Sequence, residues 1–195
     1  ETPQDEMIAL MAGRDVAQLY PERNMRQGEE VLRIEALNAP GLQDVSLSMR
    51  AGEILGIAGL VGCGKSELGR AVIGLIRTGS GAIRYAGRDL GRMSVAARMR
   101  AGLYYLPSDR KAEGLVMGQG ARFNTSIRAG NSDGAGHAGY VSARRECAMA
   151  RTVTGRVDLR PADIERPMAL FSGGNQQKVL FAKALSADLR LLILD

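Results

Sequence analysis

The chain has 195 residues, of which 45% are hydrophobic and 24% are charged, the composition of one globular domain. Its longest nearly uncharged run, at about residues 54–64, is shorter than the roughly 18 apolar residues that a membrane span needs, and we expect no secretory signal because the pattern of a basic segment followed by an apolar one is not found. Two cysteines and one histidine, His137, are too few for a disulfide framework or a zinc site, so we expect a cytoplasmic protein without either.

The net charge of +5 is compatible with nucleic acid, an anionic ligand or an anionic membrane surface as partner. The arginines are scattered along the chain, however, and aromatic residues make up only 4% of it. Stacking on single strands needs more aromatic side chains than this. We therefore expect no nucleic-acid partner.

The first segment, residues 1–28, is predicted to be a helical linker. Thr2 is a good N-cap and Pro3 suits the first helical position, while residues 21–30 are mostly polar. The globular part is therefore predicted to span residues 29–195.

The globular part begins with a strand-rich pattern. Residues 31–37 and 45–49 alternate apolar and polar side chains, as half-buried strands do. Residues 53–58 are mostly apolar and are predicted to form a strand that leads into a glycine loop, which a helix follows at 65–76. Further on, the pattern predicts a strand at 82–85, a helix at 95–101 and a strand at 103–106.

The second half is predicted to be largely helical. Residues 114–139 indicate loops around one short helix, and longer helices are expected at about 143–157 and 174–187. Residues 191–194 form an aliphatic strand that delivers Asp195 to its end, the edge where α/β proteins bind ligands. The order of these elements predicts an α/β fold with a mainly parallel sheet, opened by an antiparallel hairpin. Because chains rarely stop at a core strand, we expect a truncation after Asp195.

Residues 59–66 match the phosphate-binding loop G-x-x-x-x-G-K-[ST]. Such a loop converges backbone N–H groups on a phosphate, bridges phosphates with its lysine and ligates Mg²⁺ with its hydroxyl. The predicted binding residues are Gly59, Gly62, Cys63, Gly64, Lys65, Ser66 and the adjoining Glu67. Cys63 is read either as a small filler of the loop or as a reactive thiol.

Two later segments complete the pattern. The acid after the last strand, Asp195, is expected to hold Mg²⁺ together with Ser66. Residues 172–178 place a Ser-Gly-Gly turn at the start of a helix, which is a second anion cradle. Because two cradles so far apart in sequence do not easily serve one phosphate chain, we expect each chain to complete the site of a partner.

These motifs closely resemble those of ABC transporter ATP-binding domains. The sequence Ser-Gly-Gly-Asn-Gln-Gln-Lys at 172–178 resembles the signature of the monosaccharide importers of the ribose, galactose and xylose type. Residues 107–115 and 62–68 resemble the corresponding stretches of the second of the two nucleotide-binding domains in those ATPases, and residues 11–21 resemble the linker between the domains.

The resemblance implies a P-loop ATPase fold and a set of partners. It implies a mainly parallel core, an N-terminal antiparallel β part and a helical subdomain at about 115–188, with the C-terminal part missing. It also implies binding of ATP and Mg²⁺, a second nucleotide-binding domain in the same polypeptide or a dimer, membrane permease subunits contacted through about 115–127, and, indirectly, a periplasmic sugar-binding protein. The chain would lie on the inner face of the cell membrane. The residues expected to contact the nucleotide of the partner domain are Ser172, Gly173, Gly174 and Asn175.

Three departures from the family pattern modify this expectation. Ser108 stands where the family has a longer Glu or Gln that reaches the metal site, so catalysis is assigned to Asp195 and, with reduced coupling, to Ser108. Lys65 replaces the arginine common in second domains, which indicates that nucleotide binding is retained. The acid and the switch segment that should follow Asp195 are absent, so the chain alone is expected to bind ATP with little turnover.

Two alternatives remain at this point. One is an ABC-type ATPase that acts on DNA without transport, although the interval between Ser66 and Ser172 leaves no room for the long coiled coil of such proteins. The other is a fragment that binds ATP and hydrolyses none.

Overall fold

The computed structural model describes residues 28–127, 142–186 and 188–195. The expected linker helix, apart from Gly28, lies outside the described residues, as does His137. Within the described part, no helix is long and apolar enough to cross a membrane.

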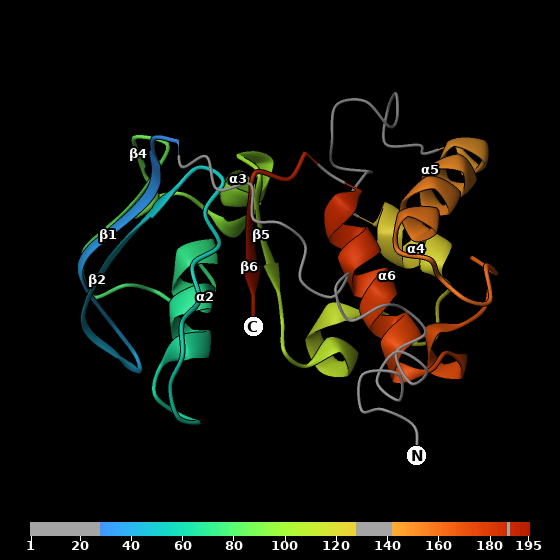
Figure 1. Ribbon diagram of the computed structural model, residues 1–195, viewed down its shortest axis with the longest axis horizontal. Helices are drawn as coiled ribbons and strands as arrows, with labels where there is room; N and C mark the ends of the chain where they lie inside the picture. The colour runs from blue at the N-terminus through green and yellow to red at the C-terminus, as the bar shows by residue number, and fades with distance from the viewer. Residues whose placement is uncertain (1–27, 128–141, 187) are drawn as a thin grey trace, which may run out of the picture.

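A four-stranded antiparallel sheet forms one side of the molecule (Figure 1). Its strands are β1 (Glu30–Ala39), β2 (Leu42–Arg50), β3 (Ser80–Tyr85) and β4 (Arg88–Asp89), in the order β2-β1-β3-β4. Leu32 and Ile34 of β1 point inward and are buried, as the alternating pattern predicted. Leu37 is buried too, although it lies three residues after Ile34, because the register of β1 shifts between these two residues. The predicted opening hairpin, β1 with β2, is confirmed.

A parallel pair of strands, β5 (Leu103–Leu106) and β6 (Leu191–Leu194), lies between two hydrophobic cores (Figure 1). Leu103 and Leu191 pack in the first core, with the antiparallel sheet and helix α2 (Lys65–Ile73). Tyr104 and Leu106, which point the opposite way, pack in the second core. Because successive side chains of a strand alternate between faces, the same two strands support both cores.

The second core is helical, and it lies on the other side of β5 and β6 from the antiparallel sheet (Figure 1). It is enclosed by α4 (Ala121–Ser126), α5 (Ala143–Arg156) and α6 (Gly173–Leu185), with a 3-10 turn η4 (Met168–Leu170). A π-helical turn, η2 (Arg110–Gly114), connects β5 to this half and packs on α6.

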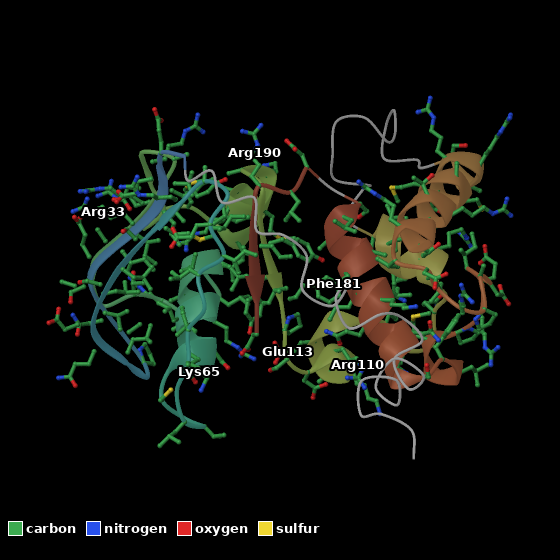
Figure 2. All side chains as sticks on the ribbon, in the orientation of Figure 1. Arg33, Lys65, Arg110, Glu113, Phe181 and Arg190 are labelled. Carbon is green, nitrogen blue, oxygen red and sulfur yellow. The ribbon has the colours of Figure 1, made fainter. Side chains whose placement is uncertain are left out.

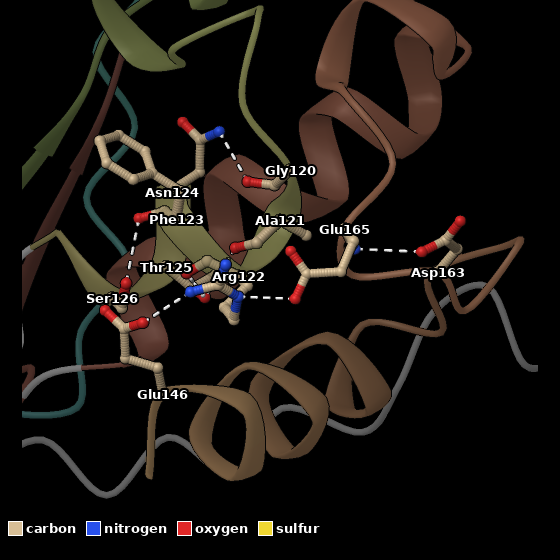
Figure 3. Close-up of polar contacts among 10 residues, drawn as sticks. All are labelled: Gly120, Ala121, Arg122, Phe123, Asn124, Thr125, Ser126, Glu146, Asp163 and Glu165. Carbon is tan, nitrogen blue, oxygen red and sulfur yellow. Dashed lines mark hydrogen bonds and ion pairs between the residues drawn. The ribbon is translucent and has the colours of Figure 1, made fainter. Parts of the chain in front are cut away.

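Helix α4 is held by polar contacts that the hydrophobic pattern did not indicate (Figure 3). The fully buried amide of Asn124 donates to Gly120 O and accepts from Val116 N. Arg122 pairs with Glu165 at 2.6 Å and with Glu146 of α5 at 2.7 Å. These bonds satisfy buried polar groups and fasten the short helix to its neighbours.

Arg98 is a charged residue that is almost fully buried, at 4% exposure. It lies on α3 (Val95–Arg100), and its guanidinium donates to four carbonyl oxygens: Ala71 O, Val72 O, Leu90 O and Met93 O. Burial lowers the pKa of Arg98, while the carbonyls solvate its charge. The side chain thereby caps the C-terminal end of α2 and ties it to the segment before α3.

The strand predicted at 53–58 is not formed, so this prediction is wrong. These residues pair with no strand in the described part of the chain, and Ile54 is 94% exposed. A strand requires hydrogen bonds to a neighbour, and apolar composition alone does not supply one. The parallel sheet is consequently limited to β5 and β6 among the described residues, while the α/β class is confirmed.

Candidate functional site

The glycine loop at 59–64 leads directly into α2. Gly64 is the N-cap and has φ +95°, and a Cβ placed on it would lie 2.5 Å from Gly41 O. Both observations require glycine at this position. The turn brings the first N–H groups of α2 to the loop, where the helix end favours an anion. This position fits the predicted phosphate-binding loop.

Lys65 folds over the loop that precedes it (labelled in Figure 2). Its Nζ donates to Gly59 O at 2.6 Å and Leu60 O at 2.7 Å, and it lies 3.5 Å from the sulfur of Cys63. The Cys63 sulfur lies against Gly59: a Cβ built on Gly59 would be 2.5 Å from the sulfur. The ammonium group is therefore held inside the loop, where an entering phosphate would meet it.

The carboxylate of Asp195 gathers three hydroxyl groups. Ser66 donates to its Oδ1 at 2.7 Å, Tyr105 to its Oδ2 at 2.7 Å, and Ser108 to Oδ2 at 3.4 Å. Burial raises the pKa of Asp195, but the hydrogen bonds from Tyr105, Ser66 and Ser108 and the nearby charge of Arg70 outweigh it, so the pKa is lowered. The structure thus brings together Ser66, Ser108 and Asp195, the three residues predicted for the metal and catalytic site.

The oxygen atoms of Ser66 and Asp195 suit Mg²⁺, which prefers hard oxygen ligands and usually keeps several waters or phosphate oxygens. No group of three or more His, Cys, Asp or Glu side chains gathers anywhere in the part of the chain that the structure describes. A cation held here would therefore complete its shell from a phosphate ligand and water. The two protein ligands fit such an ion.

Tyr105 and Arg70 belong to this site and were not predicted. Burial and the bond to Asp195 raise the pKa of Tyr105 to about 12, so its hydroxyl stays a donor. Arg70 of α2 lies beside that hydroxyl, and its Nη2 pairs with Glu113 of η2 at 2.6 Å. The only sequence signal was a tyrosine in the strand 103–106 one residue before the aliphatic end.

The second predicted cradle is at the start of α6. Ser172 and Gly173 are exposed, and the Oγ of Ser172 accepts a bond from Asn175 Nδ2 at 3.1 Å. Arg110 of η2 lies across this turn: a Cβ on Gly173 would be 2.9 Å from its Nη2. The Nε of Arg110 donates to the buried amide of Gln176 at 3.1 Å. Glycine at position 173 therefore makes room for a guanidinium.

The two cradles do not meet within the chain. Figure 2 shows Lys65 and Arg110 well apart, with Glu113 between them, so the turn at Ser172 and the glycine loop occupy separate sites. The side chain of Glu67, predicted as part of the binding segment, lies against the turn at Gly41, which borders the glycine loop at Gly64.

Comparisons with known proteins give a consistent result. Residues 42–195 match the family model described as ABC transporter. The chain is 40% identical to "Ribose import ATP-binding protein RbsA 2" of Streptomyces coelicolor over 100% of this chain and 37% of that protein. It is also 40% identical to "Ribose import ATP-binding protein RbsA" of Jannaschia sp., over 97% of this chain and 37% of that protein.

The solved structures that resemble the chain support the fold. The ATP-binding cassette MJ0796, described as a dimeric post-hydrolysis state bound to ADP and Pi, has a TM-score of 0.73 at 18% identity and covers 84% of this chain and 73% of its own. A nucleotide-free ATP-binding cassette from an ABC transporter has a TM-score of 0.68 at 19% identity, with 86% and 69% covered.

Proposed function

Because the chain belongs to the ABC transporter family, we propose that it is an ATP-binding domain of a bacterial monosaccharide importer and couples ATP binding and hydrolysis to sugar uptake. The chain spans somewhat more than a third of the length of the ribose import proteins that it matches. The names of these proteins support an ATPase of a ribose-type sugar importer over the alternative, an ATPase that acts on DNA.

The observation that carries the proposal is the meeting of the glycine loop with the last strand. Ser66 at the start of α2 donates to Asp195, 129 residues later, directly beside Lys65. In this arrangement the loop N–H groups and Lys65 would hold the phosphates of ATP, and Ser66 and Asp195 would hold Mg²⁺. The metal would neutralise charge on the phosphate oxygens. Ser108 would act next to Asp195, to whose carboxylate its hydroxyl donates at 3.4 Å.

The proposal assigns the second cradle to a partner domain. Ser172, Gly173, Gly174 and Asn175 would contact the γ-phosphate of a nucleotide held by the second nucleotide-binding domain. Ser172, Gly173 and Gly174 are exposed, and Arg110, which lies across their turn, is well apart from Lys65 in Figure 2; both observations support this assignment. We further propose the domain organisation of a linker at 1–28, a nucleotide-binding domain at 29–195 and a helical subdomain at about 115–188.

A surface for the membrane permease is proposed between the two halves. A hollow of about 410 Å³ lies there, with Leu75, Pro107 and Ile127 in its lining and Glu113 and Lys183 as its charged groups. Leu75 and Ile127 are about half exposed. A hollow next to η2 would let a permease segment touch this turn, whose Arg110 lies at Gly173 and whose Glu113 pairs with Arg70 of α2. The chain would thereby be held at the inner face of the membrane, and a periplasmic sugar-binding protein would act on it only through the permease.

Ser172→Ala is expected to leave the affinity of the isolated chain for Mg-ATP unchanged, within about twofold, because Ser172 is exposed and Arg110, which lies across its turn, is well apart from Lys65 in Figure 2. In a full transporter the same variant should lower ATP turnover, because both cradles then enclose one nucleotide. Calorimetric titration of the isolated chain and phosphate release by the transporter measure the two effects. A large loss of affinity in the isolated chain would place the cradle in cis and contradict the assignment.

The isolated 195-residue chain is expected to bind Mg-ATP and to release phosphate at a rate at least about 100-fold below that of an assembled transporter, since loss of positioned groups costs about 10²–10⁴ in rate. One cradle alone leaves the γ-phosphate uncovered, and Ser108 is a short side chain at a position that favours a longer one. A phosphate-release assay beside a nucleotide titration on one sample checks this. Robust turnover by the chain alone would contradict it, whereas binding without any turnover in the assembled state would favour a non-catalytic ATP-binding role.

A further inference from the structure

Tyr105 of β5 is held in place between strand β6 and helix α2. Its strand partner in β6 is Ile193, and Asp195 N donates to Leu106 O at 3.0 Å, so the strand pair fixes the distance between Tyr105 and Asp195. On the other side, the ring packs on Gly69 of α2, where a Cβ would lie 3.1 Å from its Cε2. Only a glycine allows α2 to approach the ring this closely.

The two carboxylate oxygens of Asp195 have different hydrogen-bond partners, and Tyr105 bonds to only one of them. Oδ2 of Asp195 accepts from Tyr105 at 2.7 Å, while Oδ1 accepts from Ser66, the other proposed metal ligand. With Oδ2 held by Tyr105 and, at 3.4 Å, by Ser108, rotation of the carboxylate is restrained and Oδ1 is directed toward Ser66. Arg70, which lies beside the same hydroxyl and is anchored by Glu113 at 2.6 Å, further restricts the tyrosine.

We propose that Tyr105 is a positioning residue of the metal site, which orients the Asp195 carboxylate so that Oδ1 and the Ser66 hydroxyl present a preformed pair of oxygen ligands to Mg²⁺. This inference rests on the proposed function, which assigns Ser66 and Asp195 to the metal. Side chains that orient a metal ligand in this way typically contribute 10–100-fold to metal affinity.

The test is Tyr105→Phe in the 195-residue chain, with Mn²⁺ as a spectroscopic probe and ADP as the nucleotide. The variant is expected to weaken Mn²⁺ binding to the ADP complex about tenfold by electron paramagnetic resonance titration. ADP affinity in the presence of EDTA and the thermal midpoint should stay unchanged, because the ring and its packing remain. Tyr104→Phe is the matched control, since Tyr104 faces the other core.

A double-mutant cycle with Asp195→Asn makes the test specific for the carboxylate. If Tyr105 acts through Asp195, then Tyr105→Phe should change Mn²⁺ affinity by less than about twofold in the Asp195→Asn background. Unchanged Mn²⁺ affinity in the single variant, an equal loss in both backgrounds, or an equal loss of ADP affinity in EDTA would each overturn the proposal. Failure of the unmodified chain to bind ADP at all would instead overturn the proposed function.

Discussion

Lys65→Ala is expected to lower the affinity for Mg-ATP by about 100-fold or more, which corresponds to about 2.7 kcal/mol. Lys65 provides the cationic side chain inside the glycine loop, where its Nζ is held by Gly59 O and Leu60 O. A phosphate that enters the loop would exchange these neutral partners for charged ones, so the lost interaction is a charge-assisted one. Isothermal titration with Mg-ATP measures the change.

The fold should survive this substitution. The two carbonyl groups that Lys65 contacts belong to an exposed loop and can bond to water instead, so the thermal midpoint is expected to shift little. Arg92→Ala is the control, because it removes one positive charge from an exposed position outside the loop. If Lys65→Ala titrates like the unmodified chain while Arg92→Ala also has no effect, the assignment of the phosphate-binding loop is wrong.

Arg98→Ala is expected to lower the free energy of unfolding by about 3 kcal/mol or more. The guanidinium donates to four carbonyl oxygens, and its bonds to Ala71 O, Val72 O and Leu90 O are buried, where an unsatisfied group costs about 1–3 kcal/mol. For a chain of this size, such a loss lowers the midpoint of thermal unfolding by roughly 10 °C. Urea denaturation followed by circular dichroism measures the free energy.

The matched control is Arg100→Ala on the same helix, since Arg100 is exposed and its loss should stay within about 0.5 kcal/mol. Arg98→Lys should be destabilising too, because one ammonium group cannot reach acceptors on two sides as the planar guanidinium does. Equal stability of the Arg98 and Arg100 variants would show that the buried bonds contribute nothing net.

The sequence predicted those parts of the fold that depend on local patterns. The hairpin of β1 and β2, helix α2 with its glycine start, and the aliphatic strand before Asp195 were all predicted close to their observed bounds. The strand at 53–58 was predicted wrongly, since its existence depends on a neighbouring strand and not on its own composition. Buried polar anchors such as Asn124 and Arg98 carry no hydrophobic signal and were missed.

The candidate site divides in the same way. Lys65, Ser66 and Ser172 lie in short motifs whose chemistry is visible in the order of residues. The contact of Tyr105 with Asp195 joins residues 90 positions apart, and that of Arg110 with Gln176 joins residues 66 apart. Such pairs arise only when β5 pairs with β6 and η2 packs on α6, so no local pattern could predict them.

The pairing of β6 with β5 has a consequence for the accuracy of assembly. All four residues of β6 are large aliphatics, so a shift of the strand by one residue would exchange Leu191 and Leu192 between the two cores at little hydrophobic cost. The same shift would turn Asp195 away from Ser66 and Tyr105. Every residue offers the same backbone N–H and C=O groups, so correct alignment must be selected by a side chain with fixed partners: the Asp195 carboxylate among its hydroxyl donors. Ser66 and Asp195, which would hold the metal, thus also help to fix the register of β6 against β5.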